Sequence, residues 1–153
     1  MDKNILIEYS DVKAEIKDLR QRIEKNRREL EKLNNTIVTD SVTCGKKGKK
    51  PLRTVKIQGR PTMYILRKEK ILERNIAGLE KLELELLELT NRVEEYIDSI
   101  DKSELRTMFR LYYINNLTWV QVAHRMNALF PKKRIKYTED SCRMKNKRFF
   151  EKV

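Results

Sequence analysis

The sequence has little glycine, proline, cysteine or histidine. Among its 153 residues are 4 Gly, 3 Pro, 2 Cys and 1 His. So few turn-forming residues argue against a β-sandwich or barrel and favour a helix-rich protein. Cys44 and Cys142 lie far apart, and neither belongs to a C-x-x-C pair or stands near His124. A zinc site normally needs several ligands at short paired spacings. We therefore expect no metal, no cofactor and two free thiols, with Cys142 packed in the core.

Long apolar runs are also absent. No stretch approaches the ~18 apolar residues of a membrane span, and residues 1–5 lack the basic and apolar regions of a secretory signal. We expect a cytoplasmic protein without membrane contact. The sequence shows no nucleophile–base pair and no carboxylate pair on a shared motif, so we expect neither enzymatic activity nor a small-molecule substrate.

Positive charge is in excess, and it is concentrated in two segments. The chain carries a net charge of +12. Residues 36–63 contribute +6 and residues 101–153 contribute +8, whereas residues 1–35 contribute +1 and residues 64–100 contribute −3. Charge focused in this way favours a polyanion, above all nucleic acid, over a merely basic surface.

Two long helices are predicted in residues 1–100, a region we treat as one domain. In the first, apolar residues alternate at spacings of four and three, the heptad pattern of a coiled coil. That pattern comprises Ile5, Tyr9, Val12, Ile16, Leu19, Ile23, Asn26, Leu30, Leu33 and Ile37, with Asn26 as its one polar member. The second helix, about Thr62 to Ile100, has a wider stripe: Ile65, Leu72, Ile76, Leu79, Leu82, Leu86, Leu89, Val93, Tyr96, Ile97 and Ile100.

The matching lengths of these helices predict an all-α fold built on a long antiparallel coiled-coil hairpin. The narrow first helix can cover part of the wide stripe. The edge formed by Leu82, Leu89 and Tyr96 would then remain uncovered, and we expect it to be buried by a second copy of the chain in a homodimer.

The break at residues 36–61 forms a basic loop. It contains Gly45, Gly48, Gly59, Pro51 and Pro61. The alternation of Leu52 and residues 54–57 allows a short strand or β-hairpin. The basic residues of the loop are Lys46, Lys47, Lys49, Lys50 and Arg53. Two interpretations stay open: a solvated loop, or an arm that contacts phosphate.

Residues 101–153 predict a domain of three short helices. Asp101 with Glu104, and Thr118 with Gln121, have the spacing of capping boxes, while Thr138 caps the last helix. The predicted core contains Leu105, Met108, Phe109, Tyr112, Tyr113, Trp119, Val122, Ala123, Met126, Phe130, Cys142, Phe149 and Val153. Three short helices with a basic last helix are typical of a helix-turn-helix DNA-binding domain.

We assign the last helix to the major groove of double-stranded DNA. The predicted base-contacting face, opposite Cys142 and Phe149, consists of Ser141, Met144, Lys145 and Arg148. The predicted phosphate contacts are Thr118, Lys132, Lys133, Arg134, Lys136, Arg143, Lys147 and Lys152. Phosphate contacts position such a protein, whereas base contacts specify the sequence.

Three segments carry a family resemblance: Leu105–Tyr113, Leu117–Ala123 and Tyr137–Arg143. They resemble the C-terminus of phage-encoded late transcriptional regulators of the ArpU/RinA type, whose module is similar to region four of bacterial sigma factors. The resemblance covers about 50 residues and implies a helix-turn-helix, a bacterial host cytoplasm and RNA polymerase as a further partner. The extended basic connection before the last helix departs from the sigma pattern.

The leading hypothesis is a sequence-specific, dimeric transcriptional regulator of a phage or prophage. One alternative is a DNA-packaging component resembling a small terminase subunit. Another is a phage-encoded inhibitor that binds a host nucleoprotein complex.

Overall fold

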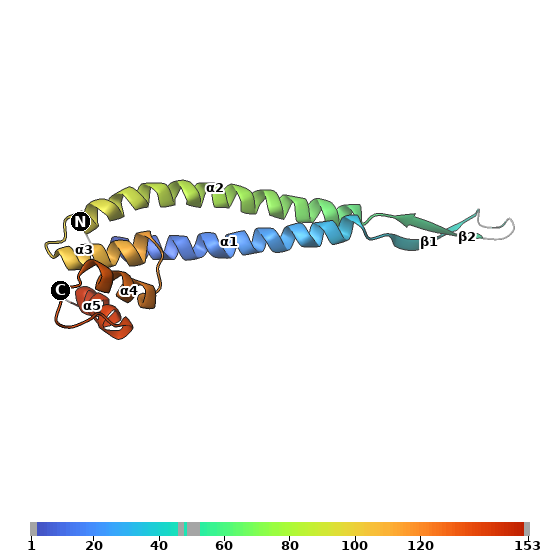
Figure 1. Cartoon of the computed structure of the whole chain (residues 1–153). Coiled ribbons are helices and arrows are strands. Elements are labelled where there is room, and N and C mark those ends of the chain that lie inside the picture. Colours follow the sequence, from blue (N-terminus) through green and yellow to red (C-terminus); the bar gives the residue numbers. More distant parts are fainter. Residues whose placement is uncertain (1–2, 46–47, 49–52, 152–153) are drawn as a thin grey trace. The chain divides into compact units, whose positions relative to one another are not determined.

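The computed structural model describes residues 3–45, 48 and 53–151 (Figure 1). The chain is mostly helical, and its elements in order are α1 (Asn4–Asn34), β1 (Val38–Cys44), β2 (Arg53–Gly59), α2 (Thr62–Asp98), α3 (Ser103–Phe109), η1 (Arg110–Ile114), α4 (Trp119–Leu129) and α5 (Glu139–Glu151). They form two compact units. One comprises Ile16–Lys81, and the other combines Met1–Glu15 with Leu82–Val153.

Helix α1 follows the predicted heptad pattern closely. Seven of the ten predicted positions are buried, and Asn26 and Leu33 are half-buried. Ile37 is the exception, because the helix ends at Asn34 and leaves Ile37 69% exposed. The Thr36 hydroxyl donates a 2.7 Å hydrogen bond to the Lys32 carbonyl and so satisfies one of the acceptors that every helix end leaves free.

Helix α2 begins directly after Pro61, which has no N–H to leave unsatisfied at a helix start. All the predicted stripe residues of α2 are buried or half-buried. The prediction that Leu82, Leu89 and Tyr96 form an uncovered edge is therefore wrong, since Leu89 is 2% and Tyr96 8% exposed. One chain already buries this stripe, so these three residues give no reason to expect a second copy of the chain.

Within unit Ile16–Lys81, the two long helices run antiparallel. Glu29 of α1 forms an ion pair with Lys68 of α2, while Leu19 of α1 lies against Gly78 of α2. The unit ends in a two-stranded antiparallel β-hairpin in which Val38 pairs with Gly59 and Cys44 with Arg53. The β-hairpin that the alternation of residues allowed is thus present, at the predicted break between the two long helices.

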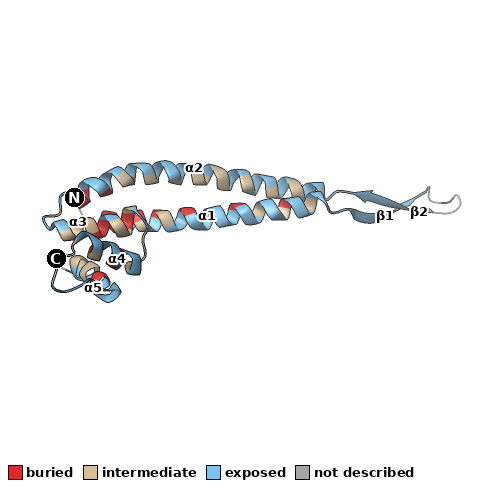
Figure 2. Ribbon diagram, viewed as in Figure 1, coloured by how far each residue is buried: buried red, intermediate tan, exposed pale blue. Residues whose placement is uncertain are grey.

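The other unit, Met1–Glu15 with Leu82–Val153, is called the C-terminal unit below, and it contains all of the largest fully buried side chains among the residues described. Figure 2 colours the buried residues of the chain red. The largest fully buried side chains are Leu6, Val93, Ile97, Met108, Phe109, Val122, Met126 and Cys142. The Phe109 ring packs edge-on against Phe149 at a centroid distance of 4.8 Å. Trp119, predicted as core, is half-buried and stacks on Tyr112 at 3.8 Å. Predicted core residue Val153 lies outside the described residues.

Two of the three predicted caps are confirmed. The Thr118 side chain accepts from the Gln121 amide in a complete capping box, and Thr138 and Ser141 bond reciprocally at the start of α5. The Asp101 prediction is wrong, because the N-cap of α3 is Lys102 and no side chain caps it. Glu104 could not complete that box, since its carboxylate is bound by Lys133 and Lys145.

A π-helical turn, η1, continues α3, with the Asn115 N–H bonded to the Arg110 carbonyl at 2.9 Å. Asn116 then adopts a positive φ of 55°, a conformation that Asn tolerates better than most residues. This turn ends the helix where the Asn115–Asn116–Leu117 sequence predicts it.

Candidate nucleic-acid interface

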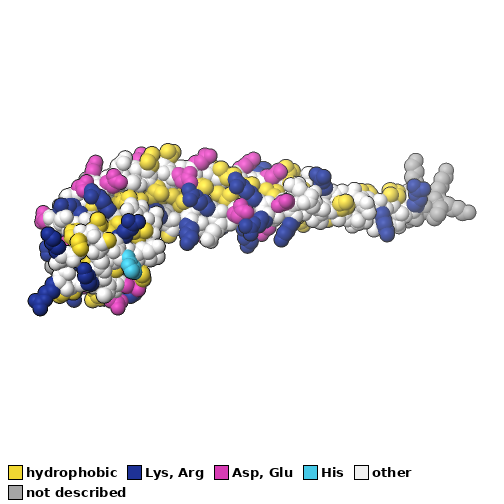
Figure 3. Space-filling view, in the orientation of Figure 1, with side chains coloured by type: hydrophobic (Ala, Val, Ile, Leu, Met, Phe, Trp, Pro, Cys, Tyr) yellow, Lys and Arg dark blue, Asp and Glu magenta, His cyan; other side chains and the backbone are white. Residues whose placement is uncertain are grey.

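Helix α5 presents a basic face to solvent. Its fully buried residue is Cys142, and Phe149 is half-buried on the same side. The residues of the opposite, exposed side include Arg143, Met144, Lys147 and Arg148. In the face that Figure 3 draws, Lys and Arg side chains are spread over the C-terminal helices. The exposed side of α5 is therefore the surface through which this helix can meet a polyanion.

Two of the predicted base-contacting residues do not lie on that side. Lys145 turns toward α3, where its Nζ atom lies 3.6 Å from a Glu104 carboxylate oxygen and 4.6 Å from the Tyr137 ring centroid. The Ser141 hydroxyl is bonded to Thr138 at the start of α5. The sequence prediction set position 145 opposite Cys142, but three residues of an α-helix bring it back to within about 60° of Cys142. Met144 and Arg148 are exposed as predicted.

Arg143 is held near the start of α5 by acidic neighbours. Its guanidinium lies 2.9 Å from an Asp140 carboxylate oxygen and 3.6 Å from a Glu139 oxygen. Lys147 lies 3.7 Å from Glu151. All of these side chains are exposed, and ion pairs of this kind contribute about 0–1 kcal/mol, so they can open when a phosphate approaches. Arg148 forms no ion pair within residues 3–45, 48 and 53–151.

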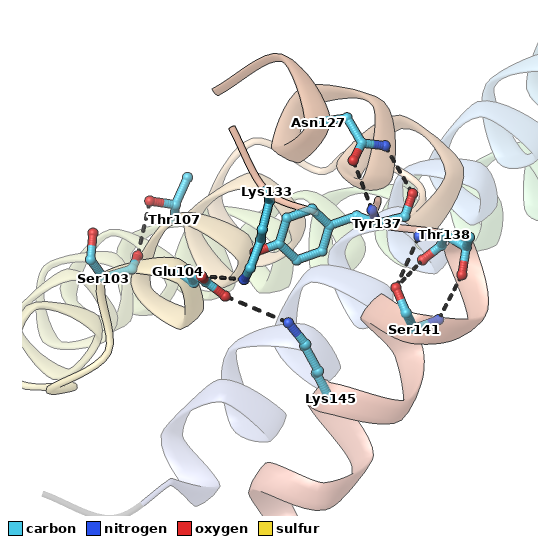
Figure 4. Close-up of polar contacts among 9 residues, drawn as sticks. All are labelled: Ser103, Glu104, Thr107, Asn127, Lys133, Tyr137, Thr138, Ser141 and Lys145. Atoms are coloured by element: carbon cyan, nitrogen blue, oxygen red, sulfur yellow. Dashed lines mark hydrogen bonds and ion pairs between the residues drawn. The ribbon is translucent and has the colours of Figure 1, made fainter. Parts of the chain in front are cut away.

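The connection between α4 and α5 is fixed at both of its ends (Figure 4). Asn127, near the end of α4, donates from its amide to the Tyr137 carbonyl at 2.8 Å and accepts from the Tyr137 N–H at 2.7 Å. Lys133 bonds the Glu104 carboxylate and, at 2.7 Å, the Tyr137 hydroxyl. Lys136 donates to the Pro131 carbonyl at 3.2 Å. This long connection is thus an ordered part of the domain.

The anchored connection displays cations and one apolar side chain. Lys132, Arg134 and Lys136 are exposed, and Ile135 is 81% exposed. Lys133, predicted to contact phosphate, is half-buried, and its ammonium group forms an ion pair with the Glu104 carboxylate. The hydrogen bond from Lys133 lowers the pKa of Glu104, and the same bond raises the pKa of Lys133. Both groups are therefore charged at neutral pH. Among the residues described, the cations of the connection that form no ion pair are Lys132, Arg134 and Lys136.

The remaining predicted residues are placed as follows. Thr118 is exposed, but its hydroxyl is occupied as the cap of α4. Arg53 is exposed on strand β2. His124 is exposed on α4. Lys46, Lys47, Lys49, Lys50 and Lys152 lie outside the described residues. Among the residues described, no group of three or more His, Cys, Asp or Glu side chains could hold a metal ion, and no helix is long and apolar enough to cross a membrane.

Sequence reasoning missed the residues that fix the connection, Asn127, Tyr137 and Glu104. Asn127 was one polar residue on a helix, and nothing in its spacing distinguishes it from a solvated side chain. A weak signal was available in Tyr137, a large aromatic residue directly before the Thr138 cap, where a hydrophobic residue often fixes the entry of the chain into a helix.

We predict that Asn127→Ala destabilises the C-terminal unit by about 1–3 kcal/mol, because it leaves the Tyr137 amide and carbonyl without their partner. Urea unfolding followed by tryptophan fluorescence measures this loss, because Trp119 belongs to the same unit. Asn115→Ala is the control, since Asn115 is exposed. Equal free energies of unfolding for the two variants would contradict the anchoring role.

A second prediction concerns pH. The pKa of Glu104 is lower in the folded state than its ordinary 4.5, chiefly because of the hydrogen bond from Lys133. Its ionised form therefore stabilises the fold above pH 4.5, and this contribution is lost as the pH falls through the lowered value. We expect Glu104→Gln to be less stable at neutral pH and to lose less stability on acidification. Parallel pH profiles for the variant and the wild type would refute this.

In comparisons with protein-family models, curated proteins and solved structures, the chain has no significant match.

Proposed function

We propose that residues 103–151 bind double-stranded DNA as a helix-turn-helix, with α5 as the recognition helix. The observation that carries the proposal is the exposed side of α5, where three cations surround Met144, namely Arg143, Lys147 and Arg148. The other side of the helix is fixed to the core by Cys142 and Phe149. A helix held on one side and basic on the other is suited to the major groove.

We assign base contact to Arg143, Met144, Lys147 and Arg148. An arginine can bind a guanine edge through two hydrogen bonds, and Met144 can contact a thymine methyl group. Ser141 and Lys145 become positioning residues, since Ser141 caps α5 and Lys145 links it to Glu104. We assign phosphate contact to Lys132, Arg134 and Lys136, because hydrogen bonds from Asn127 and Lys136 hold the connection that carries them.

The biological role that agrees best with this assignment is transcriptional regulation in a phage or prophage, with RNA polymerase as a further partner. It rests on the resemblance of residues 105–143 to late regulators of the ArpU/RinA type. We also propose that α1 and α2 form a coiled coil, because the buried positions of α1 keep a heptad spacing. A packaging role and an inhibitory role are the alternatives.

Selection of bound fragments from a random duplex library, at two salt concentrations, tests this function. A regulator should recover a consensus that survives at the higher salt, because base contacts depend less on salt than phosphate contacts do. A ring of many subunits on a consensus site would favour packaging. Enrichment of no sequence, with binding to a host protein instead, would favour the inhibitor.

A further inference from the structure

The β-hairpin has one apolar and one polar face. Side chains alternate along a strand, and residues directly opposite each other share a face. The register therefore puts Val38, Val42, Val55 and Ile57 on one face, together with Asp40, Cys44 and Arg53. The other face carries hydroxyl, amide and ammonium groups, from Thr39, Ser41, Thr43, Thr54, Lys56 and Gln58.

The apolar face is left open. Val38 is 46%, Val42 41% and Ile57 52% exposed, while Val55 is half-buried. A two-stranded hairpin by itself is at best marginally stable in water. Apolar side chains on a two-stranded hairpin stabilise it only when another surface buries them. The face consequently requires a partner surface of apolar character.

The charges on this face indicate which partner fits. At its centre, Val42 pairs with Val55. Asp40 lies one step away on one side of that pair, and Arg53, opposite Cys44, lies one step away on the other side. The two charges are about 14 Å apart along the hairpin, too far to pair within one chain. The face thus carries a carboxylate and a guanidinium symmetrically about an apolar centre.

We propose that this face is a homodimer interface in which two hairpins pack face to face and antiparallel. A two-fold axis that runs between the two sheets, at the level of the Val42–Val55 pair and across the strands, places the valines against their counterparts. It also brings Asp40 of each chain to the level of Arg53 of the other, so one contact surface complements itself. The two sheets would lie about 10 Å apart, the usual spacing of packed sheets. This interface replaces the α2 edge expected from the sequence and does not depend on DNA binding.

Nucleic acid is a poorer occupant of the same face. Four aliphatic side chains offer no hydrogen bonds to phosphate, and Asp40 would repel it. The opposite face, which carries Lys56 and no carboxylate, stays free in the proposed dimer.

Light scattering of the full chain measures its molar mass in solution and so tests whether it forms a dimer. We expect twice the 18.4 kDa of one chain for the wild type and 18.4 kDa for Val42→Asp. Thr43→Asp, on the polar face, is the matched control and should remain dimeric. A monomeric wild type, a dimeric Val42→Asp or a mass of three or more chains would each overturn the proposal.

Two further measurements distinguish an interface from a hairpin that simply fails to form. Asp40→Arg should give a monomer, and Asp40→Arg combined with Arg53→Asp should restore the dimer, because the exchanged charges meet again across the two-fold axis. In a Cys44→Ser chain, Val42→Cys should be joined to its counterpart by a short bis-maleimide, and Ser41→Cys should not. Cys142 is buried and does not compete. A monomeric double variant, or equal cross-linking at positions 41 and 42, would refute the packing.

Discussion

Replacing Phe109 with alanine is expected to destabilise the C-terminal unit by about 3–5 kcal/mol, the usual loss when a buried phenylalanine is truncated. The Phe109 side chain is 0% exposed and contacts two rings edge-on, Tyr113 at 5.9 Å and Phe149 at 4.8 Å. Because Phe149 belongs to α5, the cavity would loosen the helix that we assign to DNA. A loss of this size is a large share of a typical domain stability of about 5–15 kcal/mol.

Denaturant unfolding monitored at Trp119, the single tryptophan, measures this effect within the unit. Val120→Ala is the control in the same domain, since Val120 is 49% exposed and such substitutions usually change stability by less than about 0.5 kcal/mol. We expect a large fall in the midpoint for Phe109→Ala and little change for the control. If both variants unfold at the wild-type midpoint, Phe109 does not hold the helices together.

Reversing two charges on the exposed side of α5, with Lys147→Glu and Arg148→Glu, should abolish most DNA binding. A good base contact is worth about 1–3 kcal/mol, so two contacts amount to about 2–6 kcal/mol. Since each 1.4 kcal/mol changes Kd tenfold, we expect Kd for a duplex to rise by roughly 30-fold or more. Both side chains are exposed and neither packs in the core, so the fold should persist.

The matched control for this pair is Lys70→Glu with Arg74→Glu. Both residues are exposed on α2, outside the C-terminal unit, and their reversal changes the net charge of the chain by the same amount. Fluorescence anisotropy with a labelled duplex compares the two variants. A comparable loss of affinity in both would mean that overall charge, and not α5, attracts the DNA.

Much of the fold could be predicted because it depends on local patterns. The heptad spacing located α1, and the wider apolar stripe located α2. The capping signals at Thr118 and Thr138 located the starts of α4 and α5. The predictions failed where tertiary contacts, and not local patterns, determine where a helix ends or which residue caps it. Ile37 continued the spacing but follows the end of α1, and Asp101 had capping chemistry that α3 does not use.

The candidate site was less predictable, because it depends on what each side chain meets across the domain. Arg148 and Lys147 could be placed on an exposed face from helical spacing. Helical spacing also sets Lys145 within about 60° of Cys142, and the prediction misplaced it. Its contacts with Glu104 and Tyr137 could not be predicted, because these residues are distant in sequence. The same holds for the Asn127–Tyr137 pair, which is invisible in any periodicity. The sequence therefore predicted the helices of this domain more reliably than the direction of its charged side chains.

Equilibrium binding of the full chain to a labelled duplex over a range of salt concentrations tests the central claim most directly. Each phosphate that a lysine or arginine neutralises contributes about 0.9 to the slope of log affinity against log salt. With phosphate contacts from Lys132, Arg134 and Lys136 and further cations on α5, we predict tight binding at low salt. We also predict a linear fall with a slope of about −3 or steeper. No binding at low salt, or an affinity that salt does not change, would contradict the assignment of these helices to DNA.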